Sequence, residues 1–184
     1  YPEAKLYGFN ALAPASQKFV LPEKIPEEGR LTKGAVFGEA VDELAAGPED
    51  WPTYRGNVAR SGSSNQELGG NLEENWKVKL GGRLSALTIV REQVYVAQID
   101  QHTLHALSAA TGEKRWSFTA GGRIDSPPAY WRGRLVFGSA DGSVYCLRAV
   151  DGELIWKYRA APVDRRLMAF EQLESVWPVH GTVL

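Results

Sequence analysis

The sequence predicts an all-β protein, a partial β-propeller of four-stranded antiparallel blades. Trp76, Trp116 and Trp156 lie 40 residues apart. A period near 40, made of short strand segments and turns, is typical of propeller blades. The chain of 184 residues has 19 glycines and 10 prolines, which suit the many tight turns of such a fold. The tryptophan spacing therefore predicts about two complete blades plus flanking strands.

The N-terminal quarter differs in composition from the rest. Residues 1–49 are rich in proline and acidic residues, and we interpret them as the tail of a preceding domain or as a linker. Residues 4–10 alternate like a strand, and residues 36–46 leave room for a short helix. The aromatic and glycine-rich run that starts at Asp50 restarts the pattern. We therefore assign residues 50–184 to an incomplete propeller portion.

Short apolar segments separated by turn residues define the strands of this portion. Residues 72–80 are expected to form one outer strand. The other expected strands are 83–90, 93–98, 103–108 and 114–119 in the first repeat, and 123–130, 134–139, 143–148 and 154–159 in the second. Asp141-Gly142 predicts a two-residue hairpin with a type I′ turn, which needs a positive φ at both central positions.

A tryptophan that recurs in each outermost strand can fill the gap between neighbouring blades. The residues that we expect to dock neighbouring blades are these tryptophans and the turn residues that precede the outer strands: Trp76, Trp116, Trp156, Thr111, Gly112 and Gly152. The alternative is an aromatic cage for a ligand, but the strict period favours packing. Trp131 has no counterpart in the first repeat and is expected either at an interface or as a plug in a loop.

The repeat breaks after Trp156, where the loop to the next inner strand is enlarged over residues 160–174. Long loops of a propeller reach one face near its axis, where function concentrates. Five polar residues on or beside this loop are candidates for a partner or ligand site: Arg165, Arg166, Glu171, Glu174 and His180. The alternative is a solvated insertion with Leu167, Met168 and Phe170 tucked onto the blade.

Several other classes of site are disfavoured. The net charge of −1 gives no field that would recruit nucleic acid, and no apolar run reaches the length of a membrane span. Cys146 is the single cysteine, which excludes an internal disulfide, and we expect it to be a buried apolar residue. His102 and His105 do not share a hairpin face at their spacing. We therefore assign no metal ligand and no catalytic residue.

The runs that end at the tryptophans resemble the PQQ-like, or quinoprotein-type, β-propeller repeat. In that family Ala-x-Asp-x-x-Thr-Gly-x-x-x-Trp closes each blade. Residues 106–116 match at four positions and have Ser108 where Asp is usual. Residues 146–156 keep Gly152 and Trp156. The pattern is specific as a repeat, and it is shared by proteins of different function.

The resemblance implies a non-catalytic binding or scaffold propeller in an extracytoplasmic bacterial protein, periplasmic or attached to the cell envelope. The family also includes propellers of outer-membrane assembly and PQQ-dependent dehydrogenases. The alternative is therefore a portion of a PQQ-dependent oxidoreductase, with PQQ and calcium as cofactors. Its calcium ligands and adjacent cysteines do not map onto this sequence. Because closed propellers need about 4–8 blades, the expected partners are the remaining blades of a longer chain, together with other proteins.

Overall fold

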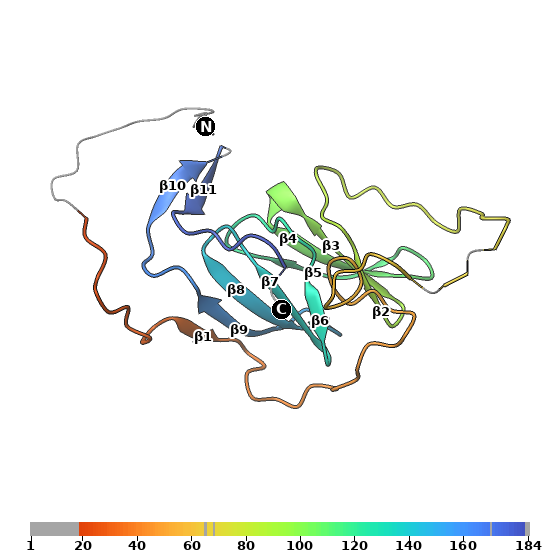
Figure 1. Cartoon of the computed structure of the whole chain (residues 1–184), viewed down its shortest axis with the longest axis horizontal. Coiled ribbons are helices and arrows are strands. Elements are labelled where there is room, and N and C mark those ends of the chain that lie inside the picture. The colour runs from red at the N-terminus through yellow and green to blue at the C-terminus, as the bar shows by residue number, and fades with distance from the viewer. Residues whose placement is uncertain (1–18, 65, 68, 170, 183–184) are drawn as a thin grey trace.

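The computed structural model describes residues 19–64, 66–67, 69–169 and 171–182. Two antiparallel sheets lie side by side, and a small hairpin lies next to them (Figure 1). The strands are β1 Leu31–Lys33, β2 Thr88–Val90, β3 Gln93–Gln98, β4 Thr103–Ser108, β5 Lys114–Thr119, β6 Ala129–Trp131, β7 Arg134–Gly138, β8 Ser143–Arg148, β9 Leu154–Arg159, β10 Arg166–Ala169 and β11 Gln172–Ser175. A single 3₁₀ turn, η1, covers Ile99–Gln101. The strand predicted over 4–10 lies outside the described residues.

The two large sheets are propeller blades with the same connectivity. Blade 1 has the order β2-β3-β4-β5, and blade 2 runs β6-β7-β8-β9 with β1 added outside β9. Cys146 pairs with Trp156 in blade 2 as Ala106 pairs with Trp116 in blade 1, and each pair is followed by a shift in register. This agreement confirms the predicted all-β propeller fold.

The middle and outer strands of both blades lie close to the predicted ranges, whereas the innermost strands are shorter. In blade 2 the strand was predicted over 123–130, but it begins only at Ala129, as β6, because Pro127 and Pro128 have no N–H to donate to a neighbouring strand. The strand predicted over 72–80 is wrong. No described strand pairs with it, and it contributes side chains instead: Trp76 and Leu80 pack against the buried face of β3.

The hairpin between β7 and β8 differs from the predicted type I′ turn. Gly142 has φ +83°, but Asp141 does not have a positive φ. The N–H of Gly142 donates to the carbonyl of Ser139 over 3.0 Å, and the N–H of Ser139 donates to the carbonyl of Ser143 over the same distance. The loop is therefore a three-residue connection with glycine last. The Asp141 carboxylate accepts the N–H of Ser143 over 3.0 Å, which stabilises this alternative.

The core lies between the two blades. Tyr95 and Leu104 of blade 1 meet Phe137, Tyr145 and Leu147 of blade 2 in one buried cluster. The rings of Phe137 and Tyr145 are stacked, with centroids 5.3 Å apart. Aromatic side chains of this size dominate the burial of apolar area, so the blades are joined by a true core.

The segment before the propeller portion packs on blade 2. Strand β1 pairs with β9 from Leu31 opposite Tyr158, so blade 2 has five strands. Val36 is buried against Cys146 and Ile155. The short helix predicted within 36–46 is not formed; turns occupy the start of this range, where Gly38 takes φ +87°.

Candidate functional site

Two of the predicted docking tryptophans lie on glycines of the following turn. The indole N–H of Trp76 donates to the carbonyl of Ala109 over 2.7 Å. A Cβ added to Gly112, where φ is +72°, would lie 2.5 Å from Cε3 of Trp76. The ring of Trp116 covers Gly152 in the same way, and its N–H donates to the next blade's Ala149 carbonyl. Both the positive φ and the close approach of the ring require glycine at these positions.

The remaining docking residues have local roles. Thr111 accepts the N–H of Glu113 through its hydroxyl over 3.3 Å, which supports the turn before β5. Trp156 packs near Val36 and Cys146. Among the described residues, no turn of a following blade lies against it as Gly152 lies against Trp116.

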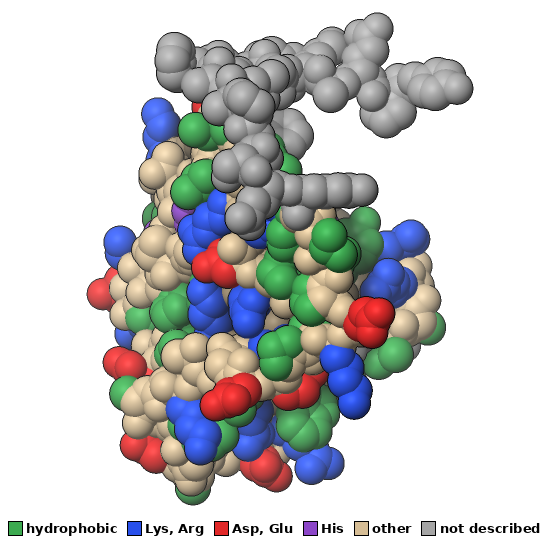
Figure 2. Space-filling view, turned by 90° about the vertical axis from the view of Figure 1, so that its left-hand side faces the viewer, with side chains coloured by type: hydrophobic (Ala, Val, Ile, Leu, Met, Phe, Trp, Pro, Cys, Tyr) green, Lys and Arg blue, Asp and Glu red, His purple; other side chains and the backbone are tan. Residues whose placement is uncertain are grey.

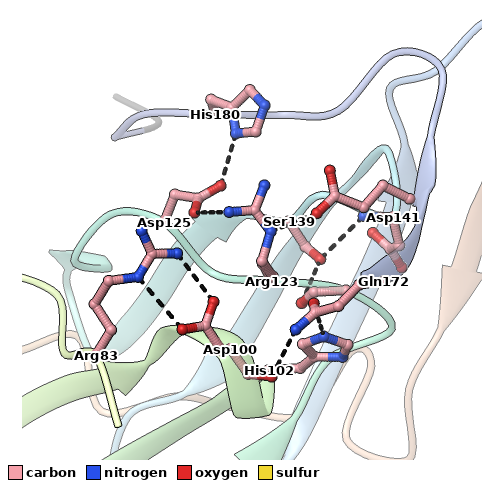
Figure 3. Close-up of polar contacts among 11 residues, drawn as sticks. Arg83, Asp100, His102, Arg123, Asp125, Ser139, Asp141, Gln172 and His180 are labelled. Atoms are coloured by element: carbon pink, nitrogen blue, oxygen red, sulfur yellow. Dashed lines mark hydrogen bonds and ion pairs between the residues drawn. The ribbon is translucent and has the colours of Figure 1, made fainter. Parts of the chain in front are cut away.

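A buried arginine organises the polar residues where the enlarged loop meets blade 2. Both Arg123 and Glu174 have side chains that are 5% exposed, and the Nε of Arg123 pairs with the Oε1 of Glu174. Its Nη1 lies 3.0 Å from Oδ1 of Asp125. The other oxygen of Asp125 lies 2.7 Å from Nδ1 of His180 (Figure 3). The structure thus connects two of the five predicted loop residues, Glu174 and His180, through Arg123 and Asp125.

A second set of contacts joins the loop to blade 1. The side-chain amide of Gln172 donates to the carbonyl of Asp100 over 3.1 Å, and its oxygen lies 2.7 Å from Nε2 of His102 (Figure 3). Asp100 in turn pairs with Arg83. His105 lies apart from His102, buried, with its Nε2 3.2 Å from Oε1 of Gln98. The loop is therefore fastened to both blades.

The enlarged loop is a hairpin, β10–β11, whose outer side faces solvent. Met168 and Leu173 pair on this side and are 46% and 52% exposed, whereas Leu167 pairs with Glu174 on the other side and is 42% exposed. The alternative in which Leu167 and Met168 are tucked onto the blade is therefore wrong, and Phe170 lies outside the described residues. The remaining predicted polar residues do not join the Arg123 cluster: Arg165 stacks over Phe19, Arg166 pairs with Asp164, and exposed Glu171 takes φ +60° at the turn.

Asp141 forms a second buried polar group beneath this region. Its Oδ2 accepts the hydroxyl of Tyr145 over 2.6 Å and the ammonium of Lys157 over 2.7 Å. Burial raises the pKa of the Asp141 carboxyl, but the hydrogen bonds from Lys157 and Tyr145 outweigh it and hold that pKa below its usual value. The carboxylate is charged and fully engaged, which suits a structural ion pair.

A wide hollow lies elsewhere, beside β6. It has a volume of about 860 Å³ and is walled by the 46–64 segment, Trp51 and Trp131. Trp131 is 60% exposed, with the guanidinium groups of Arg132 and Arg134 5.5 and 5.6 Å from its ring centroid.

Comparison with known proteins decides the family. Residues 64–175 match the family model described as outer membrane protein assembly factor BamB. The chain belongs to the BamB family. This match spans both blades and the β10–β11 hairpin. No helix within the described residues is long and apolar enough to cross a membrane.

Relatives of this BamB-family chain include much longer proteins. It is 26% identical over 148 residues to the dehydrogenase subunit of an alcohol dehydrogenase (quinone) from Komagataeibacter europaeus, covering 71% of this chain and 20% of the relative. The corresponding subunit from Gluconobacter oxydans (strain 621H) is 28% identical over 139 residues, covering 65% and 18%. The chain thus spans about a fifth of the length of these curated relatives.

Solved structures give the same fold. The quinohemoprotein alcohol dehydrogenase from Comamonas testosteroni is similar with a TM-score of 0.53 at 21% identity, over 61% of this chain and 19% of that one. A europium-containing methanol dehydrogenase is similar with a TM-score of 0.52 at 21% identity, over 62% and 24%. At this identity the likeness concerns the fold of the BamB-family chain.

The described residues do not fit a calcium-bound quinone. One carboxylate oxygen of each of Asp125, Asp141 and Glu174 pairs with an arginine or lysine, and the described part holds no group of three or more potential metal ligands. Cys146 is buried, and burial raises the pKa of its thiol to about 11. In this BamB-family segment Asp125, Asp141 and Glu174 are therefore engaged in ion pairs.

Arg123, which connects the cluster, was not among the site residues predicted from the sequence. A signal for it was present, because Arg83 and Arg123 are 40 residues apart and each precedes an inner strand. Both arginines also pair with a carboxylate, Asp100 for Arg83 and Asp125 for Arg123. The repeat offset could therefore have identified the position, although not its partner Glu174.

Proposed function

We propose that this chain is a non-catalytic binding portion of a scaffold propeller in an extracytoplasmic bacterial protein. We further propose that the β10–β11 hairpin receives a protein partner, and that remaining blades of a longer chain close the ring. Two findings support this proposal: the chain belongs to the BamB family, and it covers only 20% of the length of a curated relative. The observation that carries it is the contrast between the two sides of the hairpin.

One side of the hairpin is anchored and the other is presented. Glu174 and Gln172 hold it to both blades through buried or partly buried bonds. Met168 and Leu173 pair across the two strands on the opposite side, and both are exposed. Apolar side chains held exposed on a rigid element are typical of protein interfaces, and arginine is enriched there. Arg165 and Arg166 precede these residues in the chain.

Site-specific cross-linking tests this function in the full-length protein in its cell envelope. A photoreactive residue at Met168 should give a discrete cross-linked band, and the same residue at Val150, which is 67% exposed on blade 2, should not. Arg165→Ala combined with Arg166→Ala should weaken the band. Equal labelling at both positions would count against a partner site on the hairpin.

A second candidate is a portion of a PQQ-dependent oxidoreductase. The relatives named as quinone alcohol dehydrogenases favour it. Because the described residues do not fit the cofactor, a quinone would have to be held elsewhere in the parent protein. Titration of the full-length protein with PQQ and calcium, followed by absorbance, distinguishes the candidates: a saturable spectral change favours the oxidoreductase, and its lack favours the scaffold.

A further inference from the structure

A small basic cavity lies where β1, blade 2 and the start of β10 meet. Its volume is about 170 Å³. The charged residues that line it are Arg30, Lys157, Arg159, Arg166, Asp141 and Asp164. Figure 2 views the molecule from the side that carries β10–β11, where lysine and arginine side chains gather across the middle of the face. The lining thus has two more positive than negative side chains.

The first repeat lacks the cations that β9 contributes to this cavity. Ser117 and Thr119 occupy in β5 the places that Lys157 and Arg159 occupy in β9, at the same offset of 40. Blade 1 has neither an added strand like β1 nor a hairpin like β10–β11 in the described part of the chain. Three features that distinguish blade 2 from blade 1 therefore converge on one cavity.

Two of the four cations keep donors for a ligand. The Arg30 guanidinium donates to the carbonyls of Arg159 and Ala160 and pairs with Glu27. Lys157 is committed to Asp141. Arg166 contacts Asp164 through Nε over 3.3 Å, which leaves its terminal amino groups. The Arg159 guanidinium makes no hydrogen bond or ion pair with any other described residue.

We propose that this cavity binds a phosphate group. Arg159 and Arg166 supply planar sets of N–H donors, which match phosphate oxygens in pairs. Arg30, Lys157 and Arg166 each face a carboxylate, so the charge of Arg159 is the unbalanced one. A phosphate anion neutralises it and has enough oxygens for both guanidinium groups, whereas a carboxylate has only two. Lys157 adds to the positive field while it remains paired with Asp141. The cavity shares Arg166 with the hairpin side proposed to receive a partner, but Arg159 belongs to blade 2, and binding of inorganic phosphate to the protein does not require that partner.

Calorimetric titration of the full-length protein with inorganic phosphate at low salt tests the site. Arg159→Ala and Arg166→Ala should each weaken binding about 10- to 100-fold, which corresponds to a lost hydrogen bond to a charged group. Arg159→Lys should fall between wild type and Arg159→Ala, because lysine keeps the charge but not the paired donors. Arg115→Ala removes an exposed arginine of β5 and should leave binding unchanged.

Two further titrations define the ligand. Phenyl phosphate binding as tightly as inorganic phosphate would assign the site to a phosphate ester, and weaker binding would assign it to free phosphate; acetate should bind more weakly than either. Circular dichroism shows whether each variant is folded. If Arg159→Ala does not fold, the phosphate affinity of Arg166→Ala tests the site. The proposal is overturned if phosphate gives no saturable heat, if both alanine variants bind like wild type, or if Arg115→Ala weakens binding equally.

Discussion

Replacing Arg123 with methionine is expected to destabilise the protein strongly, because it leaves a buried carboxylate without its cation. Arg123 and Glu174 are each 5% exposed, so removal of the guanidinium leaves Glu174 without its cation in a site closed to water. Breaking a buried pair from one side costs about 3–5 kcal/mol. Glu174→Gln should cost less, about 1–3 kcal/mol, since a neutral amide replaces the charge while Arg123 keeps Asp125 at 3.0 Å.

Urea unfolding at neutral pH measures these free energies, and Arg83→Met is the matched control. Arg83 occupies the equivalent place in the first repeat, but its ion pair with Asp100 is 60% and 41% exposed, so its loss should cost at most about 1 kcal/mol. Amide hydrogen exchange should also show that β10–β11 loses protection in Arg123→Met. A loss no larger than that of Arg83→Met, or a larger loss for Glu174→Gln than for Arg123→Met, would refute the reasoning.

Three other predictions concern the blades. Trp116→Ala should lower the free energy of unfolding by about 3 kcal/mol, since it removes the ring that covers Gly152; a change within 0.5 kcal/mol, the usual range for surface sites, would argue against docking. Asp141 has a lowered pKa in the folded state, so its stabilising effect is present above the unfolded value of about 3.9 and lost as pH falls below it. Asp141→Asn should therefore flatten the pH dependence of urea unfolding below about pH 4, and an unchanged slope would contradict this assignment. Cys146 should not react with a thiol reagent at pH 8 until urea unfolds the protein, because burial raises its pKa to about 11; fast labelling of native protein would contradict the buried position.

The sequence predicted what is repeated and local. Strands β3, β4, β5, β8 and β9 lie where the alternation of apolar residues placed them. The 40-residue tryptophan spacing also predicted which residues occupy equivalent places in the two blades. Such signals are strong because the four strands that each repeat supplies bond to neighbours close by in sequence.

Features that depend on distant partners were not predictable in this way. Strand β1 has three exposed residues with no apolar pattern, and it forms because the edge of β9 is available more than a hundred positions later. The expected strand over 72–80 had a suitable pattern but no described neighbour to pair with. Arg123 and Glu174 are 51 positions apart, outside the repeat offset. Their pairing follows from tertiary burial, which the sequence pattern does not encode.

The docking of each tryptophan on the next turn also gives the chain a direction. Trp76 rests on Gly112 and Trp116 on Gly152, so each ring is completed by residues that follow it. Loss of a C-terminal neighbour exposes the ring of the blade before it, whereas loss of an N-terminal neighbour uncovers a glycine and leaves the following ring in place. Cooperativity along such an array therefore has a direction. Unfolding that starts at the C-terminal side should spread toward the N-terminus more readily than unfolding from the N-terminal side spreads toward the C-terminus.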